Sequence, residues 1–272
     1  MSSYELEMEM EGILMETFQL TRKDMSQLLI SLTGHPGKSP KAILREVWLK
    51  SRREQPGESR SFDAYVGASI SPILAKVMEI NPAKEAGLSL SDIVALGGQI
   101  EYNHFAVTAV QNWVKRDLKE IIGSPRLGKK YSFQQAAILF IIEDLRAALD
   151  LESIRRLLLR IFRHCDSDAD DLIHPVDFYA AYSGLFEELD PNNDQVLDLP
   201  GSPGRDFKHD HLMEALVKKK ADDFAASLPG LSPPEREAVR NCMVIAMLSV
   251  QTAYFQSLAK RYFQASMFLQ NL

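Results

Sequence analysis

The chain of 272 residues has few of the features that mark secreted, metal-binding or membrane-spanning proteins. It contains two cysteines, Cys165 and Cys242, whose separation fits no metal site and indicates two buried thiols in a reducing compartment. The N-terminal residues MSSYELEMEMEG lack the basic start and the apolar stretch of a secretory signal. The uncharged stretch between Arg240 and Lys260 is interrupted by polar residues, which argues against a membrane span. We therefore expect a cytoplasmic protein without a membrane partner.

Sequence signatures of catalysis are also missing. The six histidines form no H-E-x-x-H pair, and the chain has no glycine-rich phosphate loop and no G-x-S-x-G turn. Scattered carboxylates can still assemble in a folded enzyme, but no pattern in the sequence argues for one. We expect a protein that is not an enzyme and that carries no cofactor.

Two short stretches match the spacing of metal sites in part. The sequence D-S-D-A-D-D-L-I-H-P-V-D, from Asp166 to Asp177, places carboxylates at positions 1, 3, 5 and 12 of a calcium-binding loop. Position 6, where such a loop needs glycine, is Asp171, so the pattern favours a polar, helix-capping loop over a calcium site. The segment His209-Asp210-His211 is typical of solvated histidines near a helix start. We expect no bound metal.

Charge is distributed unevenly along the chain. With 46% hydrophobic and 25% charged residues the composition is that of a soluble globular protein, and the net charge of -6 excludes a generally basic nucleic-acid binder. Between Leu88 and Tyr131, however, six basic residues outnumber four acidic ones. A locally basic module inside an acidic chain is the first indication of function.

The periodicity of the apolar residues is helical throughout, and no strand-like alternation persists. Helix starts are predicted at Thr21, at Ser39-Pro40, at Ser89, at Thr108 and at Ser132, and a short helix is predicted over 72–78. The segment AAILFII is apolar on every side, as in a central buried helix. The helix LESIRRLLLRIFRH carries an arginine stripe, and a last helix runs from Ser232-Pro233 to about Leu269.

Four regions are predicted from these patterns. Residues 1–60 form an N-terminal helical segment that ends in the linker QPGESRS, and residues 61–163 form a DNA-binding domain. Residues 164–210 are an acidic connection, rich in proline, glycine and asparagine, with a short helix. Residues 211–272 form a C-terminal helical region for dimerisation or effector binding.

The middle of the chain has the parts of a winged helix-turn-helix. Two helices, LSDIVAL and AVQNWVKRDL, precede the segment GSPRLGKKYS, which suits a small β-hairpin wing. Val110, Trp113 and Val114 give the second helix an apolar stripe at i, i+3 and i+4. Its polar side can reach bases or phosphates, and the wing carries a basic tip. The residues assigned to DNA are Thr108, Gln111, Asn112, Lys115, Arg116, Arg126, Lys129 and Lys130.

Residues 105–162 resemble the N-terminal domain of MerR-type transcription regulators. The corresponding segments are AVQNWVKRDL, the wing ending KKYS, QQAAILFIIEDLRAAL and LESIRRLL. By this resemblance Gln111 takes the place of a phosphate-contacting arginine, and Asn112 and Trp113 take the places of paired tyrosines. Asp117 replaces the glycine that ends the recognition helix, and the turn before Thr108 is longer than in a simple helix-turn-helix.

Residues 60–200 are still more similar to the bacterial family called domain of unknown function 1836, which is described as having a MerR-like helix-turn-helix and a helical C-terminal part. The resemblance implies a mainly α fold, with a MerR-like winged helix-turn-helix and a small β-hairpin wing embedded in an all-helical protein. It implies a sequence-specific transcription regulator that binds double-stranded DNA.

Two questions stay open at this point. The alternative function is a helical protein-interaction module that keeps the fold without binding DNA. The last helix either joins a homodimer, as two-fold DNA binders require, or forms the spine of the C-terminal core.

Overall fold

The structure is a computed structural model that describes residues 18–54, 61–81, 86–163, 170–190 and 209–270. Regular structure in these ranges is helical, and no β-strand is formed there, which confirms the mainly α prediction. In chain order the elements are α2 (Arg22–Leu32), α3 (Pro40–Glu54), α4 (Phe62–Ala68), α5 (Pro72–Met78), α6 (Leu90–Gly97), α7 (Val107–Asn112), the π-helical segment η1 (Trp113–Asp117), α8 (Lys119–Ile122), α9 (Phe133–Leu145), α10 (Leu151–Leu158), α11 (Pro175–Glu188), α12 (His209–Ser227) and α13 (Pro233–Gln270).

Most helices begin where local signals predict. Thr21, Ser89 and Ser132 each form a capping box, in which the hydroxyl accepts from the third helical N–H and that residue's side chain accepts from the cap N–H. Helix α5 has the predicted bounds, with Pro72 in the first helical position, where its missing N–H costs nothing. These starts depend on neighbours within three residues, so the sequence alone could predict them.

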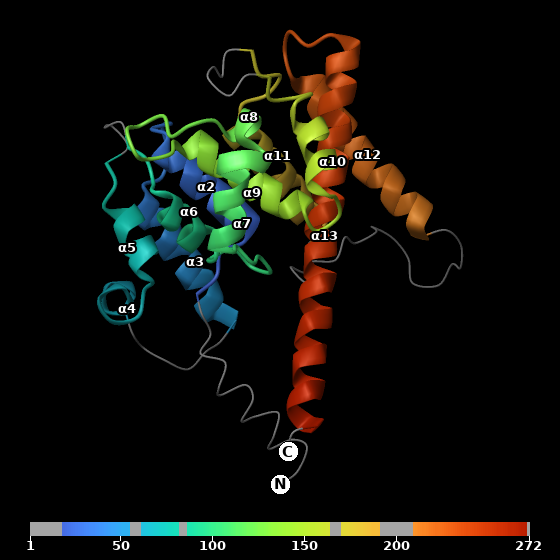
Figure 1. Cartoon of the computed structure of the whole chain (residues 1–272). Coiled ribbons are helices and arrows are strands. Elements are labelled where there is room, and N and C mark those ends of the chain that lie inside the picture. The colour runs from blue at the N-terminus through green and yellow to red at the C-terminus, as the bar shows by residue number, and fades with distance from the viewer. Residues whose placement is uncertain (1–17, 55–60, 82–85, 164–169, 191–208, 271–272) are drawn as a thin grey trace.

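Helix α9 is the centre of the molecule (Figure 1). Helices α2, α11 and α13 pack against it, and its residues are buried on nearly every side, as predicted for AAILFII. Helix α11 contributes the aromatic residues Phe178, Tyr179 and Tyr182, all fully buried. The stretch DFYAAYSGLF, which we expected to be a short helix in an acidic connection, is thus part of the core.

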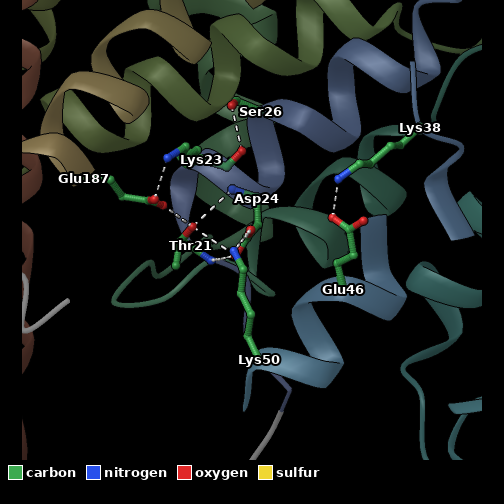
Figure 2. A network of polar contacts seen from close by, with 8 residues as sticks. All are labelled: Thr21, Lys23, Asp24, Ser26, Lys38, Glu46, Lys50 and Glu187. Atoms are coloured by element: carbon green, nitrogen blue, oxygen red, sulfur yellow. Dashed lines mark hydrogen bonds and ion pairs between the residues drawn. The ribbon is translucent and has the colours of Figure 1, made fainter. Parts of the chain in front are cut away.

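A fully buried ion pair joins three of these helices. Arg22 Nε lies 2.9 Å from Asp144 Oδ1, and the Tyr182 hydroxyl donates to Asp144 Oδ2 at 2.7 Å. At the same end of α2, Thr21 donates to Glu187 of α11 at 2.7 Å, and Lys23 pairs with that carboxylate (Figure 2). The first turn of α2 is therefore fastened to both α9 and α11.

Helix α10 is shorter than predicted. It ends at Leu158 instead of continuing to His164, because the chain turns there and the N–H of Leu172 bonds to the carbonyl of Ile161 at 2.9 Å. The turn directs Ile161 and Phe162 into the core together.

Helices α12 and α13 form a helical hairpin joined by residues 228–232 (Figure 1). The first half of α13 is a core helix, since Met243, Met247 and Val250 are fully buried. The second half runs past the body of the molecule and exposes large apolar side chains. By length and composition alone α13 could cross a membrane, a test that core helices also pass.

Candidate nucleic-acid interface

The segment from α7 to α8 is anchored by one apolar side. Val110, Trp113 and Val114 are buried, as their spacing predicted. The guanidinium of Arg146, at the end of α9, lies over the Trp113 ring at 5.0 Å from its centroid. With this side fixed, the opposite side of the segment faces outward.

Helix α7, the predicted recognition helix, begins two residues earlier than predicted, so Thr108 is not its cap. Ala106 occupies the cap position and makes no side-chain bond to the helix. The start is set by Phe105, which packs edge-on against Phe140 at 5.5 Å between ring centroids. Because that ring is anchored in α9, the backbone enters helical conformation directly after it, and Thr108 lies exposed in the first turn.

The predicted helix AVQNWVKRDL is not a continuous α-helix. After Asn112 the chain widens into η1, where the N–H of Leu118 bonds to the carbonyl of Trp113 at 3.0 Å, a five-residue closure. In an α-helix, residues five apart point roughly 140° from each other, so Trp113 and Leu118 could not both face the core. The π-helical turn brings both side chains inward, and Lys115 and Arg116 lie on its outer side.

Seven of the eight predicted DNA-binding residues are exposed. Five of them lie on α7 and η1: Thr108, Gln111, Asn112, Lys115 and Arg116. Lys129 and Lys130 lie on the turn after α8. Arg126 differs because it is half-buried beside Gln135, to which its backbone N–H donates at 3.4 Å.

The predicted hairpin wing is a single tight turn. Leu127 and Lys130 exchange backbone hydrogen bonds at 3.0 and 3.1 Å around Gly128, which has φ +66°. The next residue, Tyr131, pairs with Leu88 and not with a second wing strand. No strand forms in this part of the described chain, so the prediction of a β-hairpin was wrong.

Gln135 explains the missing strands. Its buried amide donates to the carbonyls of Ile122 and Ser124 at 2.8 and 2.7 Å, and its oxygen accepts from the N–H groups of Arg126 and Ser132. These backbone groups are therefore bound by a side chain of α9 and are not available to a β-ladder.

A groove of about 550 Å³ borders the exposed segment. It is lined by Arg116, Asp117, Lys119, Glu120, Gly123, Ser124 and Arg155. Lys119 is a cation that the sequence reasoning missed, although it lies only three residues beyond Arg116. No ion pair joins Lys115, Arg116, Lys119, Lys129 or Lys130 to another described residue.

The predicted arginine stripe, which begins on α10 and continues past its end to Arg163, is by contrast largely ion-paired. Arg155 bonds to Glu152 and Glu120, and Arg156 bonds to Glu152 at 2.8 Å. Hydrogen bonds from these two arginines lower the pKa of Glu152 to about 2. Arg163 pairs with Glu235. Three of the four arginines of the stripe are thus ion-paired, and the exposed Arg160 makes no ion pair with another described residue.

A second depression, of about 460 Å³, lies between α7 and the α9–α10 turn. Asn112, Trp113 and Arg146 line it, and Arg146 also donates to Glu143 at 2.9 Å. Burial raises the pKa of Glu143 to about 7, and Arg146 opposes that effect. Arg146 therefore lies between a carboxyl group that binds a proton near neutral pH and Trp113 of η1.

The described residues form no metal site. Among the described residues no three His, Cys, Asp or Glu side chains cluster as a metal site would require. Residues 164–169, with Cys165 and the start of the calcium-like loop, lie outside those residues, as do the side chains of His209 and His211. Cys242 is buried as predicted, and burial raises its pKa to about 12, so it is an inert thiol.

Comparison with known proteins places this region in a family. The model for the domain of unknown function (DUF1836) matches residues 85–182, which span α6 to most of α11. An uncharacterized protein of Bacillus subtilis (strain 168), YkrK, is 33% identical over 247 residues, which cover 91% of this chain and 97% of the relative. No solved structure matches the chain. The chain belongs to the DUF1836 family.

Proposed function

We propose that this protein is a sequence-specific transcription regulator that binds double-stranded DNA through a MerR-like helix-turn-helix. The observation that carries the proposal is the two-sided character of α7 and η1. Val110, Trp113 and Val114 hold one side in the core, while the outer side presents Gln111, Asn112, Lys115 and Arg116. Amide side chains can pair bidentately with adenine, and arginine or lysine with guanine or phosphate.

The state of the cations supports this proposal. Lys115, Arg116, Lys129 and Lys130 make no ion pair with described residues, whereas the arginines of α10 do. Exposed, unpaired cations release counterions when they bind phosphate, and this release provides most of the affinity for DNA. Lys119 extends the same surface into the neighbouring groove.

We further propose that the protein acts as a homodimer joined by the distal half of α13. One recognition segment reads few base pairs, and two copies can read half-sites about 34–36 Å apart. Phe255, Tyr262, Phe263 and Phe268 are between 48% and 72% exposed, and buried between two copies they would stabilise a dimer.

The same exposed aromatic residues are the observation that favours the alternative function, a helical protein-interaction module that does not bind DNA. The two functions differ in salt dependence. DNA affinity set by phosphate contacts falls steeply as salt increases, whereas apolar docking is far less sensitive.

The test is selection of binding sites from a random duplex library by the purified full-length protein, followed by titrations at several salt concentrations. We expect the parent protein to enrich one sequence. The Asn112→Ala variant should bind that sequence with lower affinity and should prefer different bases. The control Arg156→Ala removes an exposed but ion-paired charge and should leave binding nearly unchanged. Failure to enrich any sequence, with affinity independent of salt, would favour the protein-interaction module.

A further inference from the structure

The turn between α6 and α7 is held from outside the helix-turn-helix. Residues 98–106 are more than the three or four that such a turn needs. The N–H of Leu20 donates to the carbonyl of Gln99 at 2.7 Å, and the N–H of Glu101 donates back to Leu20 at 3.0 Å. Arg22, whose other contact is the buried Asp144, also donates to the carbonyl of Glu101 at 3.3 Å. The extra residues of the turn are thus bound to Leu20 and to Arg22 at the start of α2.

Tyr102 connects this turn to α13. Its ring stacks edge-on with Tyr254 at 5.0 Å between centroids, and the guanidinium of Arg261 lies 5.9 Å from the same ring. Nearby on α13, Gln256 donates to the carbonyl of Ala147, just after α9, at 2.9 Å. Residues 254–261 of α13 therefore contact both the turn and the end of the central helix α9, and we call the contacts of Tyr254 and Arg261 with Tyr102 the grip.

The backbone of Tyr102 is in a conformation that its neighbours must impose. Its φ is +58°, and it is the only non-glycine residue with positive φ in the described part of the chain. Tyrosine rarely adopts this region, and such outliers persist only where the surrounding structure holds them. Three residues later, the Phe105 ring packs on Phe140. The same ring lies so close to Gly97 that a Cβ atom at that position would come within 2.5 Å of it. The chain between these two anchors leads directly into α7.

We infer that α13 sets the position of the recognition segment through its grip on Tyr102, so that binding of a second copy on distal α13 changes DNA affinity. This inference rests on the proposed function. The exposed Phe255 and Tyr262 are the immediate neighbours in sequence of Tyr254 and Arg261. The Phe255 ring lies 5.4 Å from the Tyr254 ring, between centroids, so a second copy that packs on Phe255 touches the side chain that holds Tyr254 against Tyr102. By linkage, DNA binding and dimerisation then change each other's affinity by the same factor.

Trp113 provides a readout that needs no DNA. The chain has two tryptophans, Trp48 and Trp113, so a Trp48→Phe background leaves a single fluorophore in the recognition segment. Its emission and its quenching by acrylamide report the position of η1 relative to Arg146. In this background Tyr254→Ala and, separately, Arg261→Ala weaken the grip; both side chains lie outside the buried core. Gln264→Ala, exposed on the same helix, is the matched control.

We expect Tyr254→Ala and Arg261→Ala to shift Trp113 emission and to increase its quenching, while the control and the parent agree. We also expect each to weaken binding to the selected duplex at least ~5-fold, the lower end of usual coupling factors. Unchanged Trp113 fluorescence and DNA affinity in both variants would overturn the coupling. A fluorescence shift in a chain that enriches no duplex would instead support the structural coupling and refute the DNA-binding function.

Discussion

At the scale of single residues, the stability of the core depends on one buried ion pair and on the tyrosine hydroxyl bonded to it. Asp144 is 1% exposed and bonds both to Arg22 and to the Tyr182 hydroxyl. Burial alone would lower the pKa of Arg22, but the Asp144 carboxylate reverses that effect and raises it. Burial also raises the pKa of Tyr182 well above its ordinary value, so the tyrosine remains a neutral donor. The three side chains form one unit.

Asp144→Asn should destabilise the protein by about 3–5 kcal/mol, because it leaves the buried guanidinium of Arg22 without a counter-charge. Chemical denaturation of the two proteins measures the difference. Glu214→Gln, which breaks the exposed pair with Lys218 on α12, is the control and should cost at most about 1 kcal/mol. Equal effects of the two substitutions would contradict the role assigned to the buried pair.

Glu143 predicts a pH dependence of stability. Its pKa in the folded protein is about 7, against an ordinary value of 4.5, so the folded state binds the proton more tightly than the unfolded state. The resulting stabilisation is fully present below about pH 4.5 and is lost as the pH rises through about 7. Glu143→Gln keeps the side chain neutral and should leave stability at pH 5 nearly unchanged. At pH 8 the variant should be more stable than the parent by about 1–3 kcal/mol.

Thermal melts between pH 5 and pH 8 test this sign. Glu152→Gln is the control, because hydrogen bonds from Arg155 and Arg156 lower the pKa of Glu152 to about 2. That variant should gain nothing on going to pH 8. If the melting temperatures of Glu143→Gln and of its parent differ by the same amount at every pH in this range, the raised pKa is refuted.

At the scale of elements, the turn after α8 stands where a hairpin wing was predicted, and it carries two adjacent lysines. Lys129 follows Gly128 at the tip, and Lys130 closes the turn through its backbone, so both ammonium groups are free to reach phosphate. Hydrogen bonds to Gln135 hold the base of the turn, which gives the two cations a fixed support.

Changing both Lys129 and Lys130 to Ala should weaken binding to all duplexes alike and flatten the plot of log affinity against log salt by ~2 units. The matched control is Lys218→Ala with Lys219→Ala, another adjacent pair on α12. An unchanged slope in the turn variant, or an equal loss in the control, would remove the turn from the interface.

For the molecule as a whole, the net charge of -6 opposes the proposed binding to a polyanion. The surface proposed to bind DNA offers five exposed cations, Lys115, Arg116, Lys119, Lys129 and Lys130, so a single copy should bind DNA weakly at physiological salt. The proposed dimer would double the number of contacts without changing the net charge of either copy. The length of α13, roughly 57 Å at 1.5 Å per residue, lets its distal half meet a second copy beyond the body of the first.

Light scattering at micromolar concentration should give twice the 30.6 kDa mass of one chain. Phe263→Glu with Phe268→Glu should give a monomer, because charged side chains cannot be buried between two apolar faces. This pair spares the core, since Met243 to Val250 are untouched. Gln264→Glu adds charge to the same half of α13 and should stay dimeric. A mass near 30.6 kDa for the unaltered protein would reject the dimer.

Deletion of all of α13 would be uninformative, because its first half fills the core. The expectation of a core spine is therefore confirmed for the first half of the helix, and the homodimer stays a prediction for the second half. The half up to Val250 is intramolecular core, and the aromatic residues beyond it remain available for a partner.

The sequence by itself determined the features that depend on close neighbours along the chain. The capping boxes at Thr21, Ser89 and Ser132 and the buried stripe of Val110, Trp113 and Val114 follow from spacings of three or four residues. The exposure of Gln111, Asn112, Lys115 and Arg116 is the complement of that stripe.

Only the tertiary structure decided the features that depend on distant partners. Gln135 binds backbone groups that a hairpin would have paired, and Phe105 moves the start of α7. Tyr102 has a positive φ where its ring packs against Tyr254 of α13. The π-helical turn arises because Trp113 and Leu118 must reach the same core. In each case the deciding partner is another part of the fold, so local patterns along the chain could not reveal it.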